Sequence, residues 1–97
     1  MRKNTKLKTM PWDSAQYLKS DADIAEYLDA VFEDGDPELI RHALGDIARA
    51  KGMTRIAKAA GLGRESLYKA LSAQGNPEFS TVLKVIRALG LKLKVAA

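Results

Sequence analysis

The sequence contains no cysteine among its 97 residues. Disulfide bonds and thiolate metal sites are therefore excluded, and nothing in the composition indicates an oxidising compartment. Long apolar runs are also absent, because the basic stretch at residues 1–13 precedes no segment long enough for a secretory signal or a membrane span. We therefore expect a soluble, cytoplasmic protein that does not bind a membrane.

Histidine is scarce, which limits the chemistry available. His42 is the single histidine, and one histidine without cysteine or clustered acids at ligand spacing makes a poor metal site. Ser66 could join His42 and an acid in a triad, but no nucleophile-elbow glycine pattern surrounds this serine. The glycine pairs do not match a phosphate-binding loop either. We expect a protein that is not an enzyme and holds no metal and no cofactor.

The chain divides into three segments, and in each of them charges of one sign are absent or few. Residues 1–9 carry four basic side chains and no acid, residues 10–48 carry ten acids and two bases, and residues 49–97 carry ten bases and two acids. The net charge of +4 hides this division. The asymmetry indicates a polyanionic partner for the basic half, because neutralising phosphates releases condensed counterions. A solvated helix surface remains an equally good reading of the charges alone.

Length and patterning predict one small domain. Residues 1–11 are polar, basic and without apolar periodicity, so we expect a flexible basic arm there. Residues 12–97 should form a single helical domain with one modest core. The fold class that we predict is all-α, with five helices.

The first two of these helices are predicted over residues 21–34 and 37–51, largely within the acidic segment. The first shows the helical spacing i, i+3, i+4, i+7 of Ile24, Tyr27, Leu28 and Val31. Asp21 or Asp23 can cap it. Asp36 is the expected cap of the second helix, with a proline in the following first-turn position.

Three more helices are predicted in the basic segment, residues 49–97. Two short ones, residues 53–60 and 64–71, are linked by Gly61-Leu62-Gly63, which is too short for anything but a tight turn. After a loop, Ser80 is the expected cap of a last helix that Gly90 closes. The LKLKV segment that follows alternates apolar residues with lysine, the pattern of a half-buried strand. Such a strand needs a ladder partner, which a homodimer would supply.

The two short helices have the pattern of a helix-turn-helix unit over residues 53–72. Such a unit needs small or apolar residues where its helices cross, and a turn residue that accepts positive φ. The expected inner positions are all apolar or small: Ile56, Ala57, Ala60, Gly61, Leu62, Leu67 and Ala70. The outward positions are polar, glycine or amphipathic.

At these residues the chain resembles a known family. MTRIAKAAGLGRESLYKALS is similar to the helix-turn-helix of the lambda-repressor-like (XRE/Cro) superfamily. The run from GLGRESLYKALS through GNPEFSTVLKVIRALGLKL resembles addiction-module antidote proteins, the HigA-like antitoxins of type II toxin–antitoxin operons, and the similarity covers roughly residues 12–95. One departure is Gly63, where that family usually has a Ser or Thr cap; this weakens the cap by only a few tenths of a kcal/mol.

The resemblance implies that Arg64, Glu65, Ser66 and Lys69 occupy the positions that reach bases and phosphates. Their chemistry agrees, because Arg can bond guanine twice, Glu can accept from cytosine and Lys neutralises phosphate. The amides at the start of the first short helix are natural phosphate donors. The complete expected DNA-binding set is Met53, Thr54, Arg55, Gly63, Arg64, Glu65, Ser66, Tyr68 and Lys69. Tyr68 could instead pack its ring against the loop that carries Phe79.

The function that follows is that of a homodimeric repressor and antitoxin. We expect it to bind an inverted-repeat operator in double-stranded DNA and repress its own operon. The resemblance further implies a small RelE/ParE-like toxin as partner. The acidic half is then either a solvated surface or the part that meets a basic toxin. A free-standing helix-turn-helix repressor without a toxin, and a module that uses the motif for protein contacts, are the alternatives.

Overall fold

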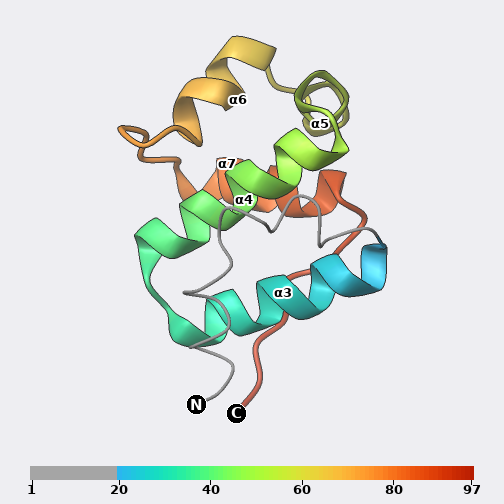
Figure 1. Ribbon diagram of the computed structural model, residues 1–97, viewed down its shortest axis with the longest axis vertical. Coiled ribbons are helices and arrows are strands. Elements are labelled where there is room, and N and C mark those ends of the chain that lie inside the picture. Colours follow the sequence, from blue (N-terminus) through green and yellow to red (C-terminus); the bar gives the residue numbers. More distant parts are fainter. Residues whose placement is uncertain (1–19) are drawn as a thin grey trace.

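The computed structural model describes residues 20–97, which fold into helices joined by loops (Figure 1). In chain order these are α3 (Asp21–Asp34), α4 (Pro37–Lys51), α5 (Met53–Ala60), α6 (Arg64–Ala70) and α7 (Phe79–Ala88). The described part of the chain holds these five helices and no strand, so the predicted all-α fold class is confirmed. The predicted arm over residues 1–11, and the start of the predicted domain, lie outside the described residues.

Helix α3 has the predicted bounds, but its N-cap is Ser20 and not an acidic residue. Ser20 has extended backbone (φ −125°, ψ 162°), and its Oγ accepts a hydrogen bond from the Asp23 N–H at 3.1 Å. The prediction that Asp21 or Asp23 caps this helix is wrong, because both residues already have helical backbone. Their carboxylates instead lie in the first turn, where negative charge is favourable.

The start of α4 matches its prediction and the start of α7 does not. Asp36 caps α4, its Oδ1 accepting from the Glu38 N–H at 3.0 Å, and Pro37 occupies the first turn. Helix α7 begins at Phe79, and the Val82 N–H donates to the Glu78 carbonyl at 3.0 Å. The first turn therefore starts from Glu78 and already includes Ser80, so Ser80 is not the cap of this helix.

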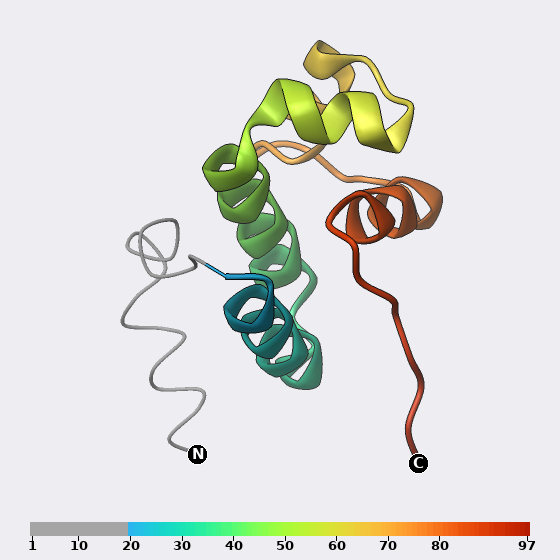
Figure 2. The same ribbon diagram turned by 90° about the vertical axis from the view of Figure 1, so that its right-hand side faces the viewer.

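The core runs along α4, which lies between α3 on one side and the pair α5 and α6 on the other, while α7 packs against α5 (Figure 2). Helix α4 faces this core with a buried stripe that includes Ala43, Leu44, Ile47 and Ala48. The other buried apolar residues are Ile24, Leu28, Val31, Met53, Ile56, Ala57, Leu67, Leu71, Val85, Ile86 and Leu89. Every described helix contributes to this cluster, so α6 is held by the same core as the rest.

The chain continues past α7 without regular structure. Gly90 has φ 81° and ends the helical region as predicted, but residues 91–97 form no strand. Residues 20–90 contain no strand with which this segment could form a ladder. Pairing between two copies stays a prediction. Among residues 20–97, no helix is both long and apolar enough to cross a membrane.

Candidate nucleic-acid interface

Three residues, Gly61, Leu62 and Gly63, connect α5 to α6. Gly61 has left-handed backbone (φ 73°, ψ 30°), and its N–H donates to the Lys58 carbonyl at 3.1 Å. The Leu62 N–H donates to the Ala57 carbonyl at 2.8 Å, which completes a Schellman motif. A Cβ at Gly61 would meet no atom within 4 Å, so conformation rather than space favours glycine here. The turn therefore stops α5 and redirects the chain into α6.

The inner faces of the two helices meet as the sequence predicted. Ile56 and Ala57 of α5 are buried, and Leu67 is completely buried, with 0% of its surface exposed. Leu71, directly after α6, is also buried. Of the remaining predicted inner positions, Ala60, Leu62 and Ala70 are half-buried, whereas Gly61 in the turn is exposed. This packing leaves the other side of α6 facing outward.

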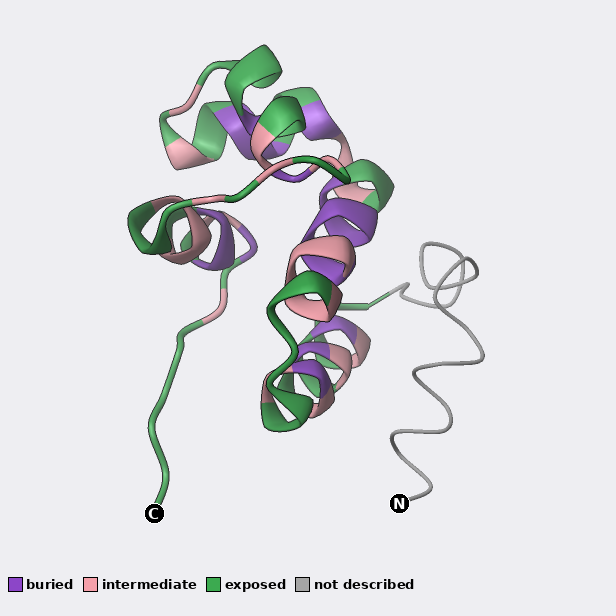
Figure 3. Ribbon diagram, turned by 90° about the vertical axis from the view of Figure 1, so that its left-hand side faces the viewer, coloured by how far each residue is buried: buried purple, intermediate pink, exposed green. Residues whose placement is uncertain are grey.

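Nearly all of the expected DNA-binding residues are exposed, on α5 as well as on α6. Exposed residues of that set are Thr54, Arg55, Gly63, Arg64, Glu65, Ser66, Tyr68 and Lys69. Figure 3 shows exposed stretches of ribbon in the helices at this end of the described chain. Met53 differs, because its side chain is only 7% exposed and belongs to the core. Only its backbone amide, the group that the sequence singled out, is left for a phosphate contact. The N-cap Gly52 offers the start of α5 no side-chain hydrogen bond.

Tyr68 leaves more than half of its surface in solvent. The exposed fraction is 55% for Tyr68 and 67% for Phe79, the first residue of α7. The phenol is available to an external partner, as an amphipathic side chain that can bond a phosphate.

The charges are separated along the long axis of the molecule. Residues 53–70 carry four basic side chains and one acid, and the helix at the opposite end, α3, carries six acids and no base. Figures 1 and 2 both show α5 and α6 at one end and α3 at the other. The end that bears the outward side of α6 is therefore the basic end of the described chain.

Helix α4 supports α6 through residues that the sequence analysis did not single out. The Arg41 guanidinium donates from Nη1 to the Ser72 carbonyl at 2.8 Å and approaches the Leu71 carbonyl at 3.5 Å. Gly45 lies one turn further along α4, and a Cβ there would come within 3.2 Å of the Leu71 carbonyl oxygen. Arg41 and Ser72 are 31 residues apart, so no local pattern signals this contact.

A buried acid on α4 is a second feature that the sequence analysis missed. Asp46 is 9% exposed, and its Oδ1 accepts from Arg49 Nη2 at 2.7 Å. Its Oδ2 lies 3.3 Å from His42 Nε2. Spacings of three and four residues along a helix bring such side chains together, so this trio could have been predicted. His42 and Arg49 are thus engaged in structural contacts within α4.

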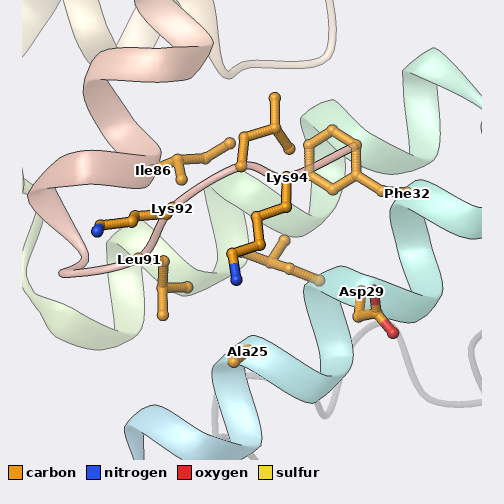
Figure 4. A pocket seen from close by; sticks show the side chains of 9 residues that line it. Ala25, Asp29, Phe32, Ile86, Leu91, Lys92 and Lys94 are labelled. Atoms are coloured by element: carbon orange, nitrogen blue, oxygen red, sulfur yellow. The ribbon is translucent and has the colours of Figure 1, made fainter. Parts of the chain in front are cut away.

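A recess lies between α3 and residues 91–94, away from α6 (Figure 4). Its volume is about 250 Å³. The residues that line it are Ala25, Leu28, Asp29, Phe32, Ile86, Leu91, Lys92, Leu93 and Lys94. Its walls are mainly apolar, with charged groups among them. No group of three or more His, Cys, Asp or Glu within residues 20–97 could hold a metal ion.

Comparison with known proteins identifies a family to which the chain is similar. A family described as "Probable addiction module antidote protein" matches residues 8–97. A protein of Haemophilus influenzae, described only as uncharacterized, is 51% identical over 84 residues, which cover 87% of each chain. No solved structure matches the chain.

Proposed function

The chain belongs to the family of probable addiction module antidote proteins, and from this premise we propose that it is the DNA-binding antitoxin of a type II toxin–antitoxin module. In this role it neutralises a small toxin similar to RelE or ParE and represses the operon that encodes both proteins. It acts by binding alone and performs no catalysis.

The observation that carries the DNA-binding part is the outward row on α6. Arg64, Glu65 and Lys69 are exposed on a helix whose opposite side is anchored by the completely buried Leu67. A helix presented in this way can enter a major groove, where Arg bonds guanine and Glu accepts from cytosine. Lys69 and the first-turn amides of α5 would hold phosphates, which fixes the register.

A homodimer would place two such helices on one duplex. An inverted-repeat operator has half-sites about 34 Å apart, one helical turn of DNA. Residues 91–95 suit the dimer contact, because Leu93 is 41% and Val95 100% exposed in the single chain. Pairing these segments between two copies would cover both side chains and satisfy their backbone groups.

The acidic end suits the toxin partner. Helix α3 carries six acids and no base, which would speed its encounter with a basic protein. Glu26 and Asp29 are exposed, so changing both to Lys should leave the fold intact. We expect the double variant to associate with the toxin at least about tenfold more slowly at low salt and to bind DNA normally.

The DNA-binding test is a mobility-shift titration with the duplex directly upstream of the reading frame. Arg64→Ala should lower affinity for this duplex about tenfold or more, because one good base contact contributes about 1 to 3 kcal/mol of discrimination. Lys84→Ala on α7 removes the same charge from an exposed position and serves as the matched control. Equal affinities of Arg64→Ala and the unaltered chain would contradict the proposal.

The toxin test is co-expression with the reading frames adjacent to this gene. The antitoxin should rescue growth from one of them and copurify with its basic product. If no neighbouring product is toxic and the DNA binding persists, the free-standing repressor replaces the antitoxin as the function.

A further inference from the structure

Helix α6 has little of its own to hold it in place. It spans seven residues, Arg64–Ala70, and its N-cap Gly63 makes no side-chain hydrogen bond. An isolated helix of this length does not form in water, because nucleation fixes several residues for few hydrogen bonds. Its placement must therefore come from tertiary contacts, of which buried Leu67 is one.

Arg41 of α4 supplies another contact, at the C-terminal end of α6. This end leaves carbonyl groups without partners inside the helix, and those carbonyls carry partial negative charge. The half-buried Arg41 donates from Nη1 to Ser72 at 2.8 Å, with Leu71 at 3.5 Å. A guanidinium is well suited to this position, because charged donors make stronger hydrogen bonds than neutral ones.

Gly45 allows the two helices to approach this closely. It is buried four residues after Arg41 on the same face of α4, and a Cβ there would come within 3.2 Å of the Leu71 carbonyl oxygen. Arg41 thus bonds the carbonyl groups of Leu71 and Ser72, and the absence of a side chain at Gly45 leaves room for the Leu71 carbonyl beside α4.

We propose that Arg41 and Gly45 set the position of α6 for reading DNA sequence, so that Arg41 is a positioning residue that acts without touching bases. This inference rests on the proposed DNA-binding function. Base contacts require side chains placed within a few tenths of an ångström, whereas phosphate contacts tolerate displacement because they are made by long basic side chains. Loss of the contacts that Arg41 and Gly45 make with the end of α6 therefore lowers the affinity for the specific operator much more than the affinity for non-specific DNA.

The test compares Arg41→Met with Lys51→Met. Both remove one positive charge and a side chain of α4 that bonds a distant segment: Arg41 bonds the carbonyls of Leu71 and Ser72, and Lys51 Nζ bonds Asp21 of α3 at 3.1 Å. Each variant is titrated against the upstream duplex and against a scrambled duplex of equal length and composition. For Arg41→Met we expect affinity for the upstream duplex to fall about tenfold or more and affinity for the scrambled duplex to fall less than about threefold. For Lys51→Met the ratio of the two affinities should stay unchanged.

Amide hydrogen exchange tests the support without DNA. In Arg41→Met the Leu71 and Ser72 amides should exchange roughly tenfold faster relative to the Leu89 amide that follows α7, because one end of α6 is released. Gly45→Ala is the second variant. It adds the Cβ that crowds Leu71 while improving helix propensity, so specificity should fall even though the free energy of unfolding changes little.

Three other outcomes would each contradict a specific step of the proposal. Equal loss of both affinities with a shallower salt dependence would make Arg41 a phosphate contact and overturn the proposal. Unchanged exchange at Leu71 and Ser72 would overturn the support itself. If the unaltered chain does not distinguish the two duplexes, the proposed function fails, and the exchange result still judges whether Arg41 positions α6.

Discussion

Replacing Gly75 with alanine tests how tightly the loop after α6 folds back onto that helix. The Gly75 N–H donates to the Ser72 carbonyl at 2.8 Å. A Cβ at this position would lie 2.2 Å from the Ala70 carbonyl oxygen and 2.5 Å from that of Lys69. Both obstacles are backbone atoms at the end of α6, so no side-chain rotation relieves the overlap.

The size of the effect follows from these distances. Ordinary contacts of a Cβ begin at 3.4 Å, so the loop or the last turn of α6 must move by about 1 Å. Overpacking of this kind costs about 1–3 kcal/mol. Gly75 does not have positive φ, so alanine would recover roughly 0.4–1 kcal/mol by restricting the unfolded chain. The net loss of stability should be about 1–2 kcal/mol.

Urea denaturation followed by circular dichroism measures this change. We expect a lower midpoint with an unchanged m value, and a Tm reduced by roughly 4–8 °C for each kcal/mol lost. Gly63→Ala is the matched control, because its Cβ would come no nearer than 3.7 Å to Ser66 Oγ and its φ of −70° is ordinary. Because Gly63 is the N-cap of α6 and alanine is a poorer cap, the stability of this variant should fall by up to about 1 kcal/mol, less than for Gly75→Ala. If Gly75→Ala proves no more destabilising than Gly63→Ala, the close approach is not a constraint on the fold.

Three other substitutions test separate parts of the described chain. Leu67→Ala should lower the free energy of unfolding by about 2–5 kcal/mol, since it empties a completely buried site; a loss below 1 kcal/mol in the same urea titration would mean that α6 is not anchored by the core. Asp36→Ala removes the bond to the Glu38 N–H and should cost about 1 kcal/mol, whereas Asp36→Ser should restore most of it; equal stabilities of the two would argue against capping. Gly61→Ala should cost about 1–2 kcal/mol because φ is 73°, and Gly61→Asn should cost less; the reverse order in thermal melts would contradict the left-handed turn.

Local chemistry made much of this fold predictable. The Asp36-Pro37 pair marks the start of α4, and Gly61 marks the end of α5, because each residue has a conformational preference that works over one helical turn. The inner and outer sides of the unit at residues 53–70 also followed from spacing alone. The exposed row that begins with Arg64 is therefore visible in the sequence.

Contacts between distant segments were not predictable in this way. The bond from Arg41 to Ser72 depends on how α4 crosses the end of α6, which no local pattern encodes. The prediction of Ser80 as a cap was wrong because the first turn starts from Glu78 and includes Ser80, and helix boundaries are uncertain by one or two residues when they are read from local signals. The expected strand at residues 91–95 was predicted to pair with a second copy, and the described residues of one chain hold no other strand.

The separation of basic and acidic ends has a kinetic consequence. It gives the described chain an electric dipole moment along its long axis, so the field of any polyanion exerts a torque that turns the α5–α6 end toward it before contact. At low ionic strength, diffusing molecules should then arrive already oriented, and fewer encounters should fail through wrong presentation. Raising the salt shortens the reach of this field to about 8 Å near 0.15 M, which restores random orientation on approach.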